Sequence, residues 1–322
     1  MLLSAGGFTR YRTETHVFNT LAPRFRGLER PADVAAALEA WLASDCHTLS
    51  GLDAEALRRD IPGRVRGPGA FLSAIMDAMT RQQGAVRWAE TTPAHILHVD
   101  EIRAQIPGAL IVHVVRDGRD VAASMERQGW IRPIAIDRER PVLAAAAYWD
   151  FVVRRGIAAG ARHGRAAYTE VRYEDLIDQP EATLGALGDF LAHRLDWAGI
   201  QRAGIGSVGR PNTSFPGAPG GFKGRWKTQL TEADAHDVDA MLAPTLRRLG
   251  YDTREDRVPP ALTARRLAYA TRFRLRERLK RIGPLASRHV DMAHFAPGSM
   301  RITADKLEGV RPVVADLPLH DG

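Results

Sequence analysis

HVVRDGRDVAAS, residues 113–124, closes an apolar run with an arginine, passes one glycine and enters a segment typical of a helix. The run itself, Leu110–Val115, predicts a buried strand. Arg116 would then lie at the carboxyl end of that strand, which is the edge where open parallel sheets place their ligands. The stretch therefore indicates a site for an anion at the edge of a sheet.

Several groups near Arg116 suit a phosphate. Gly118 permits a tight turn, and the helix that follows would present free N–H groups and the positive end of its dipole. Ser124 would add a hydroxyl donor from inside that helix, and each charge-assisted hydrogen bond is worth ~1.5–3 kcal/mol. The alternative is a strand-end arginine that only pairs with Asp117 or Asp120.

Composition bounds the class of protein. The chain has 322 residues, 45% hydrophobic and 26% charged, which is typical of a globular protein with a sizeable core. Cys46 is the single cysteine, so no intrachain disulfide forms. No window reaches the ~18 apolar residues of a membrane span, and residues 1–8 are too short for a secretory signal. These features predict a cytoplasmic protein.

Strand and helix patterns alternate along the chain, which favours an α/β fold with a largely parallel sheet. The first hundred residues look mostly helical, with breaks expected at Pro62-Gly63 and at residues 67–69. The predicted strands are 110–115 and 167–172, and the predicted helices are 31–42, 71–79, 119 onward, 141–161, 180–193, 231–250 and 262–282. In the last helix, Leu275, Leu279 and Ile282 would share one apolar side, and Tyr148 and Trp149 read as core residues.

Three further motifs accompany this stretch: WAETTP at 88–93, VRYEDL at 171–176, and PNTSF with GFKGRWKTQLT within 211–231. IPGALIVHVVRDGRDVAAS, residues 106–124, lies between the first two. In this order the chain resembles the sulfotransferase family, in particular its bacterial and tyrosylprotein-type branches. The resemblance covers residues 1–252 and leaves residues 253–322 as a basic, helical C-terminal extension.

The resemblance implies a P-loop-NTPase-like parallel sheet flanked by helices. It also implies transfer of a sulfuryl group from 3′-phosphoadenylyl sulfate (PAPS) to a hydroxyl or amine, without a metal. Residues at matching positions would bind the donor: Arg116 and Ser124 the 3′-phosphate, Tyr173 the adenine region, Thr213 and Ser214 the bridging oxygen, and Gly224, Arg225, Trp226 and Lys227 the 3′-phosphate and adenosine.

Sulfuryl transfer also needs a base for the acceptor's proton. RTETHVF, residues 12–18, resembles the segment where tyrosylprotein-type members carry their catalytic carboxylate, which makes Glu14 the candidate base. Glu90 and His16 are reserve candidates, whereas His95 and His98 read as histidines on a helix surface. Thr91 stands where many relatives carry a lysine that stabilises the leaving oxygen.

Family members begin the domain with a buried strand and a Gly/Arg/Ser/Thr loop whose amides hold the 5′-phosphosulfate. Residues 1–16 resemble the end of the helix after that loop and the segment that follows it. The resemblance thus predicts an N-terminally truncated domain, with the loop encoded upstream of Met1. The alternative is a non-catalytic remnant of the fold that binds nucleotide or another anion.

Charge is uneven along the chain. Of a net charge of +7, most comes from residues 254–281, which hold ten Lys or Arg against three Asp or Glu. A further hypothesis therefore has residues 262–282 docking on an anionic membrane or nucleic acid. The simpler interpretation is a solvated helix face or a helix that packs back on its own domain, and no nucleic-acid partner is expected. The acceptor, whether small molecule, carbohydrate, lipid or peptide, and the choice between monomer and homodimer stay open.

Overall fold

The computed structural model describes residues 1–203 and 223–300. Two compact units divide the chain: unit 1 comprises 1–109, 198–205 and 278–322, and unit 2 comprises 110–197 and 206–277. The expected boundary at residue 252 stays a prediction. Among the described residues, no helix is long and apolar enough to cross a membrane.

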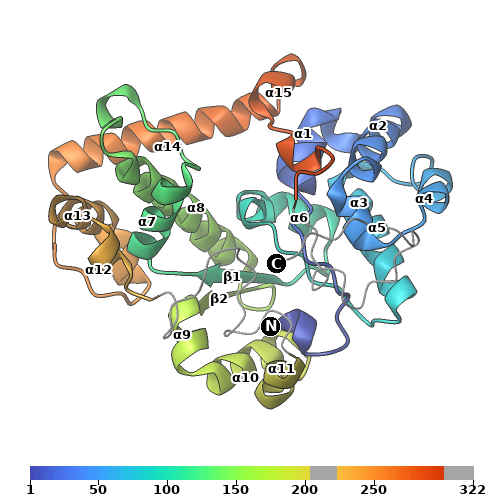
Figure 1. Cartoon of the computed structure of the whole chain (residues 1–322), viewed down its shortest axis with the longest axis horizontal. Coiled ribbons are helices and arrows are strands. Elements are labelled where there is room, and N and C mark those ends of the chain that lie inside the picture. The colour runs from blue at the N-terminus through green and yellow to red at the C-terminus, as the bar shows by residue number, and fades with distance from the viewer. Residues whose placement is uncertain (204–222, 301–322) are drawn as a thin grey trace. The chain divides into compact units, whose positions relative to one another are not determined.

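Unit 2 contains a two-stranded parallel sheet (Figure 1). β1 (Ile111–Val115) and β2 (Tyr168–Arg172) pair in register from Ile111 with Tyr168 to Val115 with Arg172. Two helices, α7 (Gly118–Gln128) and α8 (Pro141–His163), form the crossover that a parallel pair requires. The α/β class and the parallel pairing are thereby confirmed.

Three other helices of unit 2 follow the predicted signals closely: α10 (Pro180–Leu191), α13 (Glu232–Arg248) and most of α14 (Pro260–Lys280). Two short helices, α9 (Tyr173–Asp178) and α12 (Trp226–Gln229), were not predicted. Thr231 caps α13 by accepting the N–H of Asp234 at 3.1 Å, and Gly250 follows this helix with a φ of 76°. Trp149 lies in the core, as expected, at 5% exposure.

Gly118 allows close packing at the start of α7. A Cβ placed there would lie 2.6 Å from the ring of Trp149 and 2.8 Å from the side chain of Leu242. Only a glycine therefore lets the turn after β1 pack so closely against α8 and α13. The residue expected to permit a tight turn also sets the position of α7.

Unit 1 is helical, as the sequence indicates for the first hundred residues. Its elements include η2 (Val17–Leu21), α1 (Ala22–Arg24), α2 (Pro31–Leu42), α3 (Asp45–Ser50), α4 (Ala54–Asp60), α5 (Gly67–Gln83), η4 (Pro93–His98), α6 (Val99–Gln105), α15 (Gly283–His289) and η6 (Ala293–Phe295); α11 (Trp197–Ala203) lies at the boundary. The short turns η1 (Leu2–Ser4) and η3 (Arg26–Leu28) complete unit 1, and η5 (Ala135–Asp137) lies in unit 2.

One expectation about helices was wrong. The glycines at 67–69 do not interrupt a helix but begin α5, because Pro68 occupies its first turn, where its missing N–H is tolerated. The last predicted helix ends at Lys280, two residues before Ile282. Leu262, Tyr269 and Phe273 are the buried large side chains of α14, whereas Leu275 is 54% exposed.

Candidate functional site

The carboxyl edge of the sheet brings Arg116 and Tyr173 together. Val115 and Arg172 are paired, so the residues that follow them leave the sheet side by side. The Arg116 guanidinium lies over the Tyr173 ring, 5.1 Å from its centroid. This cation–π contact holds a positive charge at the edge where parallel sheets place ligands.

Glu174 fastens the two strand ends to each other. Its carboxylate accepts the N–H of Asp117 at 2.9 Å and the hydroxyl of Tyr251 at 2.6 Å. Burial raises the pKa of Tyr251, so its hydroxyl stays protonated and donates this bond. Glu174, which follows β2, therefore holds the turn after β1 in place through its hydrogen bond to Asp117.

Arg119 is a buried structural cation at the start of α7. It donates to Asp117 at 2.8 Å and to Asp239 of α13 at 2.5 Å. Its guanidinium also lies 4.5 Å from the centroid of the Trp226 ring. This arginine links α7, α13 and α12, and its fork is occupied by carboxylates.

Asp120 connects the late basic motif to the same turn. Its carboxylate accepts the backbone N–H groups of Gly224 at 2.7 Å and Trp226 at 2.9 Å. Burial raises the pKa of Asp120 despite these two bonds and the nearby Arg116. Gly224 adopts a φ of 65°, which favours glycine, so its N–H can point at the carboxylate.

Four of the predicted donor-binding residues therefore belong to one cluster: Arg116, Tyr173, Gly224 and Trp226. The expected pairing of Arg116 with Asp120 is also present, at 3.4 Å. This is longer than the ~2.7–2.9 Å of a well-formed charge-assisted hydrogen bond. Asp117, the other suggested partner, binds Arg119 instead.

The remaining predicted residues differ in what the structure says of them. Trp226 is only 4% exposed and packs against Ala123, so it anchors its segment rather than offering a free ring face. Ser124 follows Ala123 in α7 and is half-buried. Arg225 and Lys227 flank the anchored tryptophan, and Thr213 and Ser214 lie outside the described residues.

Sequence reasoning considered Asp120 only as a partner for Arg116 and missed Glu174. A signal existed for both, because each acidic residue lies within a quoted motif, next to a predicted ligand residue or one turn after it. A carboxylate repels an anion, so neither residue suggested itself as part of a phosphate site. In the structure both carboxylates accept hydrogen bonds from backbone N–H groups.

Glu14, in unit 1, pairs with His16. Its carboxylate lies 2.9 Å from His16 Nε2, and its side chain is 42% exposed. His16 has a φ of 47°, a left-handed conformation that is uncommon for a non-glycine residue. His294 Nε2 lies 2.9 Å from the backbone carbonyl of Glu14. The candidate base and one reserve candidate thus form a carboxylate–imidazole pair.

The carboxylate of Glu90, the other reserve candidate for the base, is engaged in hydrogen bonds with neighbouring side chains. It accepts the Thr15 hydroxyl at 2.8 Å, the Thr92 hydroxyl, and a hydrogen bond from His95 at 2.9 Å. Burial would raise the pKa of this carboxyl, but the hydrogen bonds outweigh burial and hold the pKa at about 2. An ionised, enclosed carboxylate of this kind is suited to holding the chain rather than to taking a proton.

The expectation that His95 and His98 lie on a helix surface was wrong. They are 6% and 5% exposed, and His95 Nε2 accepts the N–H of Phe18 at 3.3 Å. His98 Nδ1 lies 3.2 Å from the carboxylate of Glu101. His95 therefore helps Glu90 and Thr92 to fix the turn that carries Glu14 and His16.

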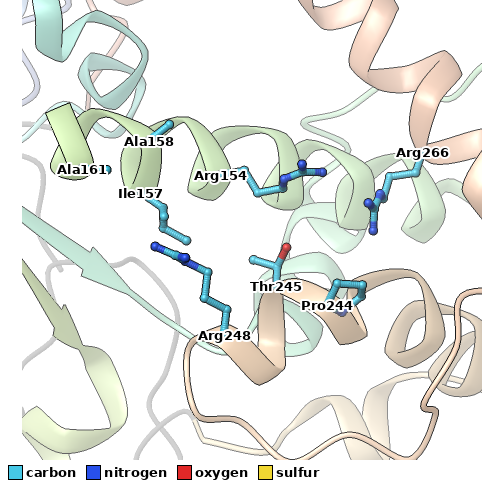
Figure 2. Close-up of a pocket in the computed structure, with 8 residues that line it drawn as sticks. All are labelled: Arg154, Ile157, Ala158, Ala161, Pro244, Thr245, Arg248 and Arg266. Carbon is cyan, nitrogen blue, oxygen red and sulfur yellow. The ribbon is translucent and has the colours of Figure 1, made fainter.

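A hollow of about 420 Å³ lies elsewhere in unit 2 (Figure 2). Arg154, Arg248 and Arg266 line it, but Arg154 and Arg266 lie 3.7 and 3.6 Å from the buried carboxylate of Asp150. None of the predicted donor residues lines this hollow. Within the described part of the chain, no group of three His, Cys, Asp or Glu side chains is placed to hold a metal ion.

The chain is similar to solved structures of sulfotransferase domains. A sulfotransferase domain from the curacin biosynthetic pathway is 16% identical, with a TM-score of 0.51 over 78% of this chain and 92% of that chain. The sulfotransferase domain of the Synechococcus PCC 7002 olefin synthase is 18% identical, with a TM-score of 0.45 over 85% and 88% of the two chains. No curated protein sequence matches this chain.

The family model described as the sulfotransferase family matches residues 8–198, which is more than half of the chain. The matched range contains the turn after β1, the turn after β2 and the segment of Glu14 and His16. The chain belongs to the sulfotransferase family.

Proposed function

We propose that this sulfotransferase takes its sulfuryl group from PAPS and delivers it to a hydroxyl or amine acceptor. The observation that carries the choice of donor is the cluster at the edge of the sheet. Arg116 lies over Tyr173, and Asp120 fastens the Gly224–Lys227 segment to the same turn. Cationic side chains are thereby gathered where a nucleotide phosphate would bind.

Each unit then has its own role. In unit 2, Arg116 binds the 3′-phosphate of the donor, Tyr173 lies beside the adenine, and Ser124, Arg225 and Lys227 add donors or charge. In unit 1, Glu14 accepts the acceptor's proton, and His16 orients the Glu14 carboxylate through their 2.9 Å contact. Glu90, Thr92 and His95 hold the turn of this pair in place.

In the proposed reaction, each bond formed or broken and the transferred proton are accounted for without a metal ion. The acceptor oxygen or nitrogen forms a bond to sulfur as the bond between sulfur and the bridging phosphate oxygen breaks. Glu14 takes the acceptor's proton, and adenosine 3′,5′-bisphosphate leaves with the electron pair. Ser214 is proposed to reach the bridging oxygen, as the resemblance implies.

A radiolabelled-sulfate assay tests this function. The full chain is incubated with labelled PAPS and a panel of phenols, sugars, amines and alcohols, and transfer of label is measured. Glu14→Gln should lower kcat by ~10²–10⁴ with little change in the KM for the donor. Glu55→Gln, at a 78% exposed side chain of the same unit, is the matched control and should leave kcat unchanged.

A second function, nucleotide binding without transfer, is favoured by Thr91, which replaces the lysine of many relatives and is exposed. Binding of adenosine 3′,5′-bisphosphate with no label transfer to any acceptor would support it and contradict the catalytic proposal. If Thr91→Lys then produced turnover, the missing cation would be the reason.

A further inference from the structure

Exposed apolar side chains in unit 2 gather on α14 and on the loop before α8. Among the described residues, seven large hydrophobic side chains are exposed, and four of them are Trp130 and Ile136 of the loop and Leu267 and Leu275 of α14. Their exposed fractions run from 54% to 71%. Large apolar groups that gather on one surface usually mark an interaction site.

Hydrogen bonds fix this loop on the helix. Tyr269 of α14 binds the Ile134 N–H at 3.1 Å and Asp137 at 3.0 Å, and Arg272 donates to the Arg132 carbonyl at 3.0 Å. Arg265 donates to Asp137 at 2.8 Å. In Figure 1 the green loop between α7 and α8 reaches the orange helix α14, as these bonds require. Loop and helix therefore form one surface.

The outer face of α14 is amphipathic. At 3.6 residues per turn, one stripe of the helix carries Ala264, Leu267, Ala268, Thr271 and Leu275, all of them exposed. None of these five residues is charged. Arginines border the stripe: Arg272 and Arg276 lie on the side of the loop, Arg274 lies on the other side, and Arg278 ends the stripe one turn after Leu275, all of them exposed.

We propose that this surface, made of the α14 stripe and residues 130–136, docks on an anionic phospholipid bilayer. The surrounding arginines complement lipid phosphates and carboxylates. The exposed leucines would enter the boundary between headgroups and acyl chains, and Trp130 suits that interface because its ring is apolar and carries one polar N–H. This inference goes beyond sulfuryl transfer and does not depend on which donor is used.

Charge and shape together indicate which partner binds this surface. Residues 260–282 hold eight Lys or Arg and one acidic residue, Glu277, so a cationic partner is disfavoured. An apolar stripe bordered by arginines is the pattern of a helix that lies in the plane of a membrane surface. An acidic protein surface is the competing occupant, and the experiment separates the two.

Sedimentation with vesicles tests the proposal on the full chain. The protein should sediment with equal mixtures of phosphatidylcholine and phosphatidylglycerol at low salt, and not with phosphatidylcholine alone. Arg274→Glu with Arg276→Glu, and separately Leu267→Ser with Leu275→Ser, should each lower the partition coefficient by ~10-fold or more. Val86→Ser, at a 77% exposed position of unit 1, is the matched control and should bind as the wild type does.

Depth of insertion provides the second measurement. Brominated lipids should quench part of the tryptophan fluorescence, and Trp130→Phe should remove the quenched part. The proposal is overturned if the wild type does not bind anionic vesicles, or if the double variant Leu267→Ser with Leu275→Ser binds them as tightly as the wild type. Binding to poly-glutamate in place of vesicles would also overturn it and assign an acidic protein as the partner.

Discussion

Asp120 accepts the backbone N–H of Gly224 at 2.7 Å, although 103 residues separate the two in the sequence. A second bond to the N–H of Trp226, at 2.9 Å, makes the same carboxylate the anchor of the late basic segment. The turn after β1 therefore determines where Arg225 and Lys227 lie. This carboxylate therefore holds the segment that carries two of the cations proposed to bind the donor.

Asp120→Ala should destabilise the protein by ~2–4 kcal/mol, because it removes the acceptor of two N–H groups in a site with little access to water. Urea unfolding of the variant and the wild type measures the difference. Asp178→Ala, which removes the exposed surface partner of Lys223, is the control and should cost less than ~1 kcal/mol. Equal losses in the two variants would show that Asp120 is not an anchor.

Gly118→Ala should also destabilise the protein, by ~1–3 kcal/mol, because the new methyl group would collide with Trp149 and Leu242. Gly185 in α10 is the matched control, since a Cβ there meets nothing within 4 Å. Gly185→Ala should stabilise by up to ~1 kcal/mol through helix propensity. Thermal and urea unfolding report both effects, and a neutral Gly118→Ala would refute the close packing.

Low pH should reduce the free energy of unfolding because Glu90 becomes protonated. Its pKa is lowered from 4.5 to about 2, so the unfolded chain binds the proton more readily in that range. The stabilisation is complete above pH ~4.5 and is lost as the pH falls towards 2, with a maximum of ~3 kcal/mol. Urea unfolding at several pH values should show a shallower acid dependence in Glu90→Gln than in the control Glu55→Gln, whose side chain is 78% exposed. Identical slopes would contradict the assigned network.

His113 should add a second pH dependence at higher pH. Burial lowers its pKa from 6.5 to about 4, and its Nδ1 shares a 2.6 Å hydrogen bond with Tyr168. Because the folded imidazole resists protonation, stability should fall as the pH drops from ~6.5 to ~4. NMR titration of the ring should show no protonation of His113 above pH ~5. A midpoint near 6.5 would mean that the ring is not enclosed.

Much of unit 2 was predictable from sequence because its signals are local. An apolar run gives β1, prolines open α8 and α10, and Thr231 caps α13. Arg116 and Tyr173 were each named as donor-binding residues, and their mutual contact came from the structure. The order of the sequence motifs indicated the sulfotransferase family, and the match of the family model over residues 8–198 confirms it.

What could not be predicted depends on contacts distant in sequence. The burial of His95 and His98 follows from Phe18 and Glu90, and neither contact leaves a periodic pattern. The sequence pattern placed Leu275, Leu279 and Ile282 on one side of the last helix, but it did not indicate that α14 buries Tyr269 and Phe273. The role of Asp120 likewise needs two backbone groups from a segment far along the chain.

Calorimetry with two nucleotides tests the central claim, that Arg116 binds the 3′-phosphate of the donor. Wild-type protein should bind adenosine 3′,5′-bisphosphate at least ~10-fold more tightly than adenosine 5′-monophosphate. Arg116→Ala should remove that difference by weakening the bisphosphate alone. If the variant kept the full preference, or if the wild type had none, the assignment of Arg116 and the donor site built on it would be contradicted.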